Sequence, residues 1–147
     1  MKEFLVKAEL ENLDRVLEFI SESIEHCPIK TQNQINIAVD EIFSNIARYA
    51  YHPETGDLIV RIEMIGDAGE GHEGFIFPAI KIEFEDKGTA YNPLIEKDPD
   101  IEKPTEEREV GGLGIFLVKK LMDSVEYKRI DDKNVLIIRK RIDLSSK

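Results

Sequence analysis

Two stretches with apolar residues at helical spacing constrain the fold more than any other feature of this chain. Apolar residues recur every three or four positions over residues 13–26, and again from about residue 31 to residue 50. Cys27-Pro28 separates the two stretches, and Thr31 is a suitable N-cap for the second. The pattern therefore predicts two consecutive amphipathic helices near the N-terminus.

The other periodic segments are typical of strands, mostly arranged as hairpins. Strands are expected over 2–9, 58–65, 75–85, 124–130 and 135–142, and a third helix over 112–122. The glycine-rich segment 66–74 predicts a hairpin loop, and residues 131–134 predict a turn. The order β-α-α-β-β-loop-α-β-β predicts an α+β fold, a two-layer sandwich with helices on one face of a mixed β-sheet. With no repeat or internal boundary, residues 1–147 are expected to form a single domain.

Charge and composition exclude several classes of function. The formal net charge is −10, which disfavours direct binding to nucleic acid or to anionic membranes. No apolar run approaches the ~20 residues that span a bilayer, and the N-terminus does not resemble a signal peptide, so a cytoplasmic protein is expected. Cys27 is the only cysteine and the three histidines lack ligand spacing, so no zinc site is expected. A phosphate ligand would need local neutralisation, from a divalent cation or from backbone N–H groups.

The first candidate constellation lies on the second expected helix. Glu41 and Asn45 are four residues apart, so they share one face of the helix, and that face borders the apolar stripe. A carboxylate beside a carboxamide suits a hard cation and a proton acceptor. An ordinary solvated helix flank would show the same pair.

The second constellation follows the strand that ends near residue 85. Asp86 would emerge at the edge of the sheet, where its carboxylate can accept a hydrogen bond from a ligand amine. Gly88 would let the backbone come close to a flat ring. A plain turn is the alternative, because Asp and Gly are common turn residues.

The third constellation opens the third helix. Gly111, Gly112 and Gly114 stand within four residues, and a helix N-terminus presents unpaired N–H groups that favour phosphate. The run lacks the Gly-Lys-Ser/Thr ending of a P-loop and the spacing of a dinucleotide-binding fingerprint. A flexible helix entry would look similar.

In this order and context, the three constellations resemble the GHKL ATPase superfamily, and within it the anti-sigma-factor serine/threonine-protein kinases. Residues 41–51 (EIFSNIARYAY) are similar to the N-box, 86–93 (DKGTAYNP) to the G1 box and 111–118 (GGLGIFLV) to the G2 box. Two positions depart from the common pattern: Tyr49 stands where histidine is usual, and Tyr91-Asn92-Pro93 stands where Phe-Asp-Pro is usual. The resemblance covers nearly the whole chain and implies the GHKL (Bergerat) ATP-binding fold.

The resemblance implies a site for ATP and Mg²⁺. Asn45 would coordinate the metal, Glu41 would be the general base, and Asp86 would hydrogen-bond the adenine amine, with Gly88 beside the ring. The stretch 94–110 would form a lid over ATP. The other ATP-binding residues that the resemblance implies are Arg48, Tyr91, Arg108, Gly111, Gly112, Leu113, Gly114, Ile115 and Phe116.

Four functions remain open on sequence alone. The leading hypothesis is an ATP-dependent protein serine kinase and anti-sigma regulator, which phosphorylates a small STAS-like anti-sigma antagonist and also binds a sigma factor. A possible homodimer is part of the same resemblance. The second hypothesis is a non-catalytic module whose protein contact ATP gates. The third is the detached ATP-binding part of a sensor histidine kinase, and the fourth is an acidic domain without a nucleotide.

Overall fold

The computed structural model describes residues 1–67, 77–95 and 112–142. The strands are β1 (Lys2–Lys7), β2 (Asp57–Asp67), β3 (Phe77–Asp86), β4 (Ser124–Ile130) and β5 (Lys133–Arg141). The helices are α1 (Leu13–Ser23), α2 (Ile29–Tyr49) and α3 (Gly112–Leu121), with short 3-10 turns at Leu10–Asn12 and Pro93–Ile95. The predicted element order is confirmed. The expected hairpin loop 66–74 and lid 94–110 lie largely outside the described residues.

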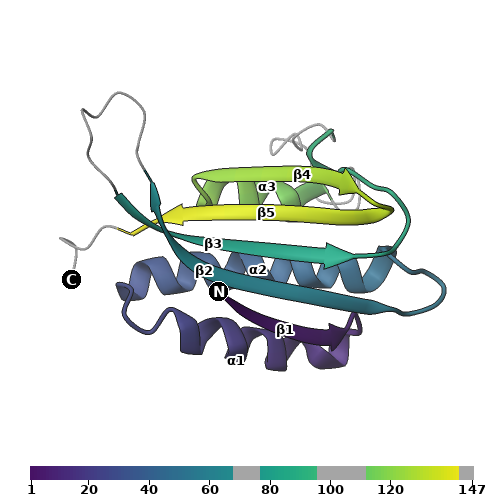
Figure 1. The fold of residues 1–147 in the computed structure, drawn as a ribbon, viewed down its shortest axis with the longest axis horizontal. Coiled ribbons are helices and arrows are strands. Elements are labelled where there is room, and N and C mark those ends of the chain that lie inside the picture. The colour runs from purple at the N-terminus through teal and green to yellow at the C-terminus, as the bar shows by residue number, and fades with distance from the viewer. Residues whose placement is uncertain (68–76, 96–111, 143–147) are drawn as a thin grey trace, which may run out of the picture.

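The described strands form one sheet in the order β1-β2-β3-β5-β4. Figure 1 shows α2 and α3 behind this sheet and α1 alongside β1, so the predicted two-layer α+β arrangement is confirmed. The expectation of a mixed sheet is wrong, because every pairing among the described strands is antiparallel. A single crossover helix would bring the chain back parallel, whereas two successive helices, α1 and α2, return it in the opposite direction.

The start of α2 also differs from the sequence prediction. The helix begins at Ile29 with Pro28 at the N-cap position, and Thr31 is buried inside the first turn. Proline suits the start of a helix because the first N–H groups have no intrahelical partner. The preceding loop is closed instead by the Gln32 side chain, whose Nε2 donates to the carbonyl of Cys27 at 2.8 Å.

The alternation along the strands divides the sheet into an apolar inner face and a charged outer face. On β2, Leu58, Val60 and Ile62 are buried against the helices. Arg61 points to the opposite face, where it pairs with Glu3 at 2.6 Å and with Glu85 at 3.2 Å. Partly exposed ion pairs add little stability, so the apolar layer between sheet and helices holds the fold together.

The C-terminal end of α2 is fastened to the segment that follows β3. The N–H of Thr89 donates to the carbonyl of Ala50 at 2.9 Å. A Cβ on Gly88 would lie 2.2 Å from the same Ala50 oxygen, so only glycine allows this approach. The Tyr51 hydroxyl accepts the Lys87 N–H at 2.7 Å and donates to the Asp57 carbonyl at 2.6 Å. These contacts, called the α2–β3 seam below, fix the end of β3 relative to α2.

We expect Tyr51→Phe to lower the free energy of unfolding by about 1 kcal/mol, because the Lys87 N–H and the Asp57 carbonyl each lose a partner. Urea unfolding followed by circular dichroism measures the change. Tyr49→Phe is the matched control, because Tyr49 is half-exposed at the last residue of α2, two positions before Tyr51. Equal stabilities of the two variants would show that the Tyr51 hydroxyl does not stabilise the seam.

Candidate functional site

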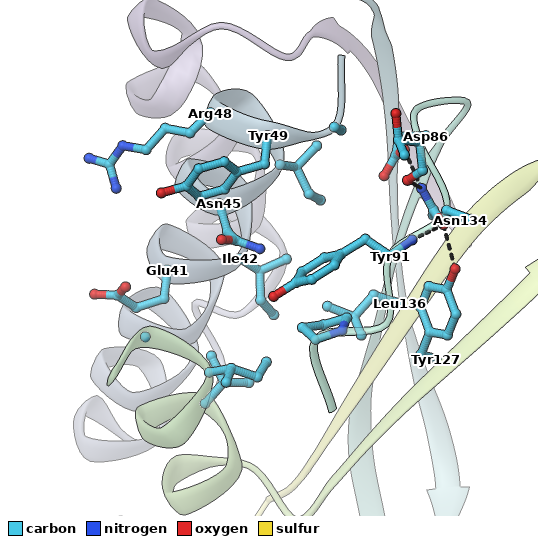
Figure 2. Close-up of a pocket in the computed structure, with 18 residues that line it drawn as sticks. Glu41, Ile42, Asn45, Arg48, Tyr49, Asp86, Tyr91, Tyr127, Asn134 and Leu136 are labelled. Carbon is cyan, nitrogen blue, oxygen red and sulfur yellow. Dashed lines mark hydrogen bonds between the residues drawn. The ribbon is translucent and has the colours of Figure 1, made fainter. Parts of the chain in front are cut away.

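A cavity of about 520 Å³ lies between α2, the end of β3, β4, β5 and the start of α3. That volume is within the range of small-molecule and cofactor sites. Figure 2 shows its lining side chains. The cavity is lined by Glu41, Ile42, Asn45, Ile46, Arg48, Tyr49, Ala50, Asp86, Thr89, Ala90, Tyr91, Pro93, Gly114, Ile115, Val118, Tyr127, Asn134 and Leu136.

One end of the cavity holds Asp86, the last residue of β3. The residue is only 4% exposed. Oδ1 accepts the Gly88 N–H at 2.8 Å and the Asn134 Nδ2 at 2.9 Å. Among the described residues none donates to Oδ2, so this oxygen can accept a further hydrogen bond. Asp86 therefore lies at the cavity, and its hydrogen bond to an adenine amine stays a prediction.

Burial raises the pKa of Asp86 above its ordinary value. The hydrogen bonds from Asn134 and Gly88 and the nearby Arg129 guanidinium act in the opposite direction. Arg129 also donates to the Gly88 carbonyl at 3.0 Å, so it contributes to the same corner of the site. The carboxylate is thus buried and held by hydrogen-bond donors of the protein.

Asn134 and Tyr127 belong to this end of the cavity, and the sequence analysis did not identify them. Residues 131–134 read as a turn, but the turn consists of Asp131 and Asp132 alone, with φ values of 50° and 62°. A two-residue turn of this kind suits a tight hairpin. Asn134 therefore falls within β5, directly opposite Asp86 in the register. The signal that could have found it is the Asp-Asp pair, because short acidic residues tolerate left-handed backbone.

The opposite wall is α2, which carries Glu41 and Asn45 one turn apart. Figure 2 shows Asn45 facing the Tyr91 ring across the cavity, with Glu41 and Arg48 pointing away from the Asp86 end. The site therefore has a carboxylate acceptor at one end and a carboxylate, a carboxamide and a guanidinium at the other. This separation suits a ligand with a nucleobase at one end and an anionic group at the other.

Helix α3 closes the Glu41 end. Gly114 and Ile115 line the cavity. A Cβ on Gly114 would lie 2.7 Å from Glu41 Oε2, so the carboxylate rests against the first turn of α3. Gly112 is the first residue of the helix and Leu113 the second. The first backbone N–H groups of a helix have no intrahelical partner, and such groups favour an anion.

Not every predicted ligand contact lies at the cavity. Phe116 does not line it, and its ring lies under the Lys120 ammonium at 5.4 Å instead. Gly88 contacts α2 rather than the cavity itself and supports the site through the seam. Arg108 and Gly111 lie outside the described residues, so their predicted contacts with ATP remain predictions.

The donor set fits Mg²⁺ when nucleotide phosphates are present. Within the described ranges there is no cluster of three or more His, Cys, Asp or Glu side chains that could hold a metal alone. Mg²⁺ commonly uses one or two protein oxygens and takes the rest from phosphates and water. The Asn45 and Glu41 side chains provide such oxygens on one helix face.

Among the described residues no helix is both long and apolar enough to cross a membrane.

Comparisons with known proteins identify a family for this chain. A family described as the histidine kinase-like ATPase domain matches residues 6–140. Serine-protein kinase RsbW of Bacillus mycoides (strain KBAB4) is 26% identical over 107 residues, covering 70% of this chain and 60% of the relative. The protein of that name from Bacillus cereus (strain AH187) is 26% identical over 111 residues, with the same shares. The matched region thus spans 60% of the length of these curated relatives.

Among solved structures, the chain is similar to the histidine kinase domain from the Erythrobacter litoralis EL346 blue-light activated histidine kinase. The TM-score is 0.47 and the sequence identity 17%, and the match covers 91% of this chain and 62% of that one.

Proposed function

Because this chain belongs to the histidine kinase-like ATPase domain family, we propose that it binds Mg-ATP in the cavity and transfers the γ-phosphoryl group to a serine of a partner protein. The observation that carries the proposal is the cavity itself. Asp86 is at one end, and Glu41 and Asn45 are at the other, beside the first turn of α3. The similarity to serine-protein kinases supports serine as the acceptor.

The base end of the proposed site depends on Asp86. Its Oδ2 would accept a hydrogen bond from the adenine amine, and the apolar side chains of Ile42, Val118 and Leu136 would cover the ring. A protein with a net charge of −10 repels a nucleotide at long range, so the binding energy must come from local contacts. The mostly apolar wall and one oriented acceptor provide them.

The phosphate end depends on α2 and α3. The backbone N–H groups at the start of α3 would bind phosphate oxygens, because the first N–H groups of a helix lack intrahelical partners and lie at the positive end of the helix dipole. Asn45 would hold Mg²⁺, which when bound supplies positive charge against the phosphates. Glu41 would accept the proton of the attacking serine hydroxyl, while the other residues position and stabilise the transferring group.

The proposed protein substrate is a small anti-sigma antagonist of the STAS-like type, with a sigma factor as a second partner. The resemblance of the three motifs to anti-sigma kinases supports this proposal, together with the similarity to the RsbW proteins. Autoradiography after incubation with labelled ATP and candidate antagonists, followed by phosphosite mapping, tests it directly.

Isothermal titration calorimetry tests nucleotide binding separately from transfer. We expect Mg-ATP to bind more tightly than ATP in EDTA, and Asn45→Ala to bring the two affinities together, because the amide oxygen that holds the metal is lost. Asn33→Ala is the matched control, since Asn33 is exposed on the same helix outside the cavity. No heat with millimolar Mg-ATP would contradict the proposed site. Tight binding without transfer to any protein would instead support a non-catalytic, ATP-gated binding module.

A further inference from the structure

Asn134 is 7% exposed and connects four chain segments at the Asp86 end of the cavity. Its Nδ2 donates to Asp86 Oδ1 and to the Thr89 carbonyl, both at 2.9 Å. Its Oδ1 accepts the Tyr127 hydroxyl at 2.5 Å and the Tyr91 N–H at 3.5 Å. One carboxamide thus joins β3, the segment after it, β4 and β5.

The backbone partners allow only one orientation of this amide. The Thr89 carbonyl can only accept a hydrogen bond, and the Tyr91 N–H can only donate one. A flipped amide would set two acceptors against each other at Thr89 and two donors against each other at Tyr91. Asn134 must therefore present its NH₂ group to Asp86.

This orientation fixes the hydrogen-bonding role of Asp86. Donors from Asn134 and Gly88 both engage Oδ1, which holds the carboxylate in one rotamer. Oδ2 is then the oxygen that faces a ligand, and it acts as an acceptor. An acceptor at this point matches an amino group on a purine base, and leaves an unpaired group opposite a base that lacks one.

We infer that Asn134 is a positioning residue for base recognition, which holds Asp86 as an oriented acceptor and so makes the site select a purine with a 6-amino group. The inference rests on the proposed nucleotide site. Asn134 itself acts through Asp86, and Tyr127 supports it from β4 by occupying its carbonyl oxygen.

The test compares the affinities for Mg-ATP and for the Mg complex of purine riboside triphosphate, which differs from ATP only in lacking the 6-amino group. We expect the unmodified protein to prefer ATP about 10-fold or more, the range for a hydrogen bond to a charged group. Asn134→Ala should reduce that preference to about 3-fold or less, with the affinity for purine riboside triphosphate changed by less than about 2-fold. Tyr127→Phe, which keeps the ring and removes one donor, should reduce the preference in the same direction by a smaller factor.

Val125→Ala is the matched control, because Val125 packs against the core from the same strand as Tyr127 and does not line the cavity. It should leave the preference unchanged. If Asn134→Ala weakened both nucleotides equally, or left the preference intact, Asn134 would have only a structural role and the inference would be overturned. If Asn134→Ala failed to fold, an unchanged preference in Tyr127→Phe would overturn it. If the unmodified protein bound both nucleotides equally, the inference about Asn134 would be overturned, but the proposed nucleotide site would still be supported. If the unmodified protein bound neither nucleotide, both the inference and the proposed function would be overturned.

Discussion

Glu41→Gln should bind Mg-ATP about as tightly as the unmodified protein and transfer its phosphoryl group to a protein serine at least about 100-fold more slowly. The substitution keeps the shape of the side chain, so its contact with the first turn of α3 at Gly114 is preserved. An amide, however, cannot accept the proton of the serine hydroxyl. A loss confined to the transfer rate would therefore identify Glu41 as the proton acceptor.

Calorimetry and a single-turnover phosphorylation assay measure the two quantities separately. Asp40→Asn is the matched control: Asp40 is the neighbouring acid on α2, accepts the Ser44 hydroxyl at 3.1 Å and does not line the cavity. We expect this variant to transfer phosphate at nearly the original rate. Transfer by Glu41→Gln at that same rate would rule out the assigned role.

Asp86→Asn should weaken Mg-ATP binding by about 100-fold or more. The new amide oxygen can still accept the Gly88 N–H and the Asn134 amide, so the fold around the site is kept. The new NH₂ group then stands where Oδ2 offered an acceptor, and it would face the adenine amine donor to donor. The substitution thus replaces an acceptor by a donor at the Oδ2 position and nearly keeps the shape of the side chain.

Although Asp86→Asn should weaken nucleotide binding, we do not expect it to lower the free energy of unfolding at neutral pH. Because burial raises the pKa of Asp86, the folded state holds the proton more tightly than the unfolded state. The free energy of unfolding therefore falls as pH rises from about 4 through the raised pKa. Above that pKa, the destabilisation by the buried charged carboxylate is fully present. Two nearby charges also act on this carboxylate: the Arg129 guanidinium opposes the upward pKa shift, and the Glu85 carboxylate adds to it. At neutral pH we expect Asp86→Asn to be at least as stable as the unmodified protein.

Thermal unfolding at several pH values, with calorimetry at pH 7, tests both expectations. Glu85→Gln is the matched control, since Glu85 adjoins Asp86 but points to the outer face, where it pairs with Arg61 at 3.2 Å. It should retain nucleotide binding. Full ATP affinity in Asp86→Asn would contradict the placement of adenine at this end.

Sequence periodicity predicted the helices and strands well, because each carries an apolar face of the right period. It predicted the two hairpins, but not the directions of β1 against β2 or of β3 against β5, because these depend on the helices that connect the strands. The position of Asp86 at the end of a strand was visible from the change in pattern at residues 85–88. The predicted contacts of Asp86, Asn45 and Glu41 with a nucleotide and Mg²⁺ stay predictions.

Two residues show why the rest of the site was harder to predict. Asn134 lies 48 residues from Asp86 along the chain, and only the register of β3 with β5 brings them together. Phe116 stands inside a contiguous glycine-rich motif, but each helical residue turns by about 100° from the last. Gly114, Ile115 and Val118 therefore face the cavity while Phe116 faces Lys120. The spacing of a sequence motif does not show which residues pair across strands or which residues of a helix face the cavity.

The α2–β3 seam sets the distance between the two ends of the cavity in this structure. Its hydrogen bonds tie Thr89 and Lys87, just beyond Asp86, to Ala50 and Tyr51 at the end of the helix that carries Asn45 and Glu41. Hydrogen bonds therefore connect the two ends of the site directly. A ligand that binds at the Asp86 end can contact Asn45 and Glu41 only if its own length matches the distance between the two ends of the cavity.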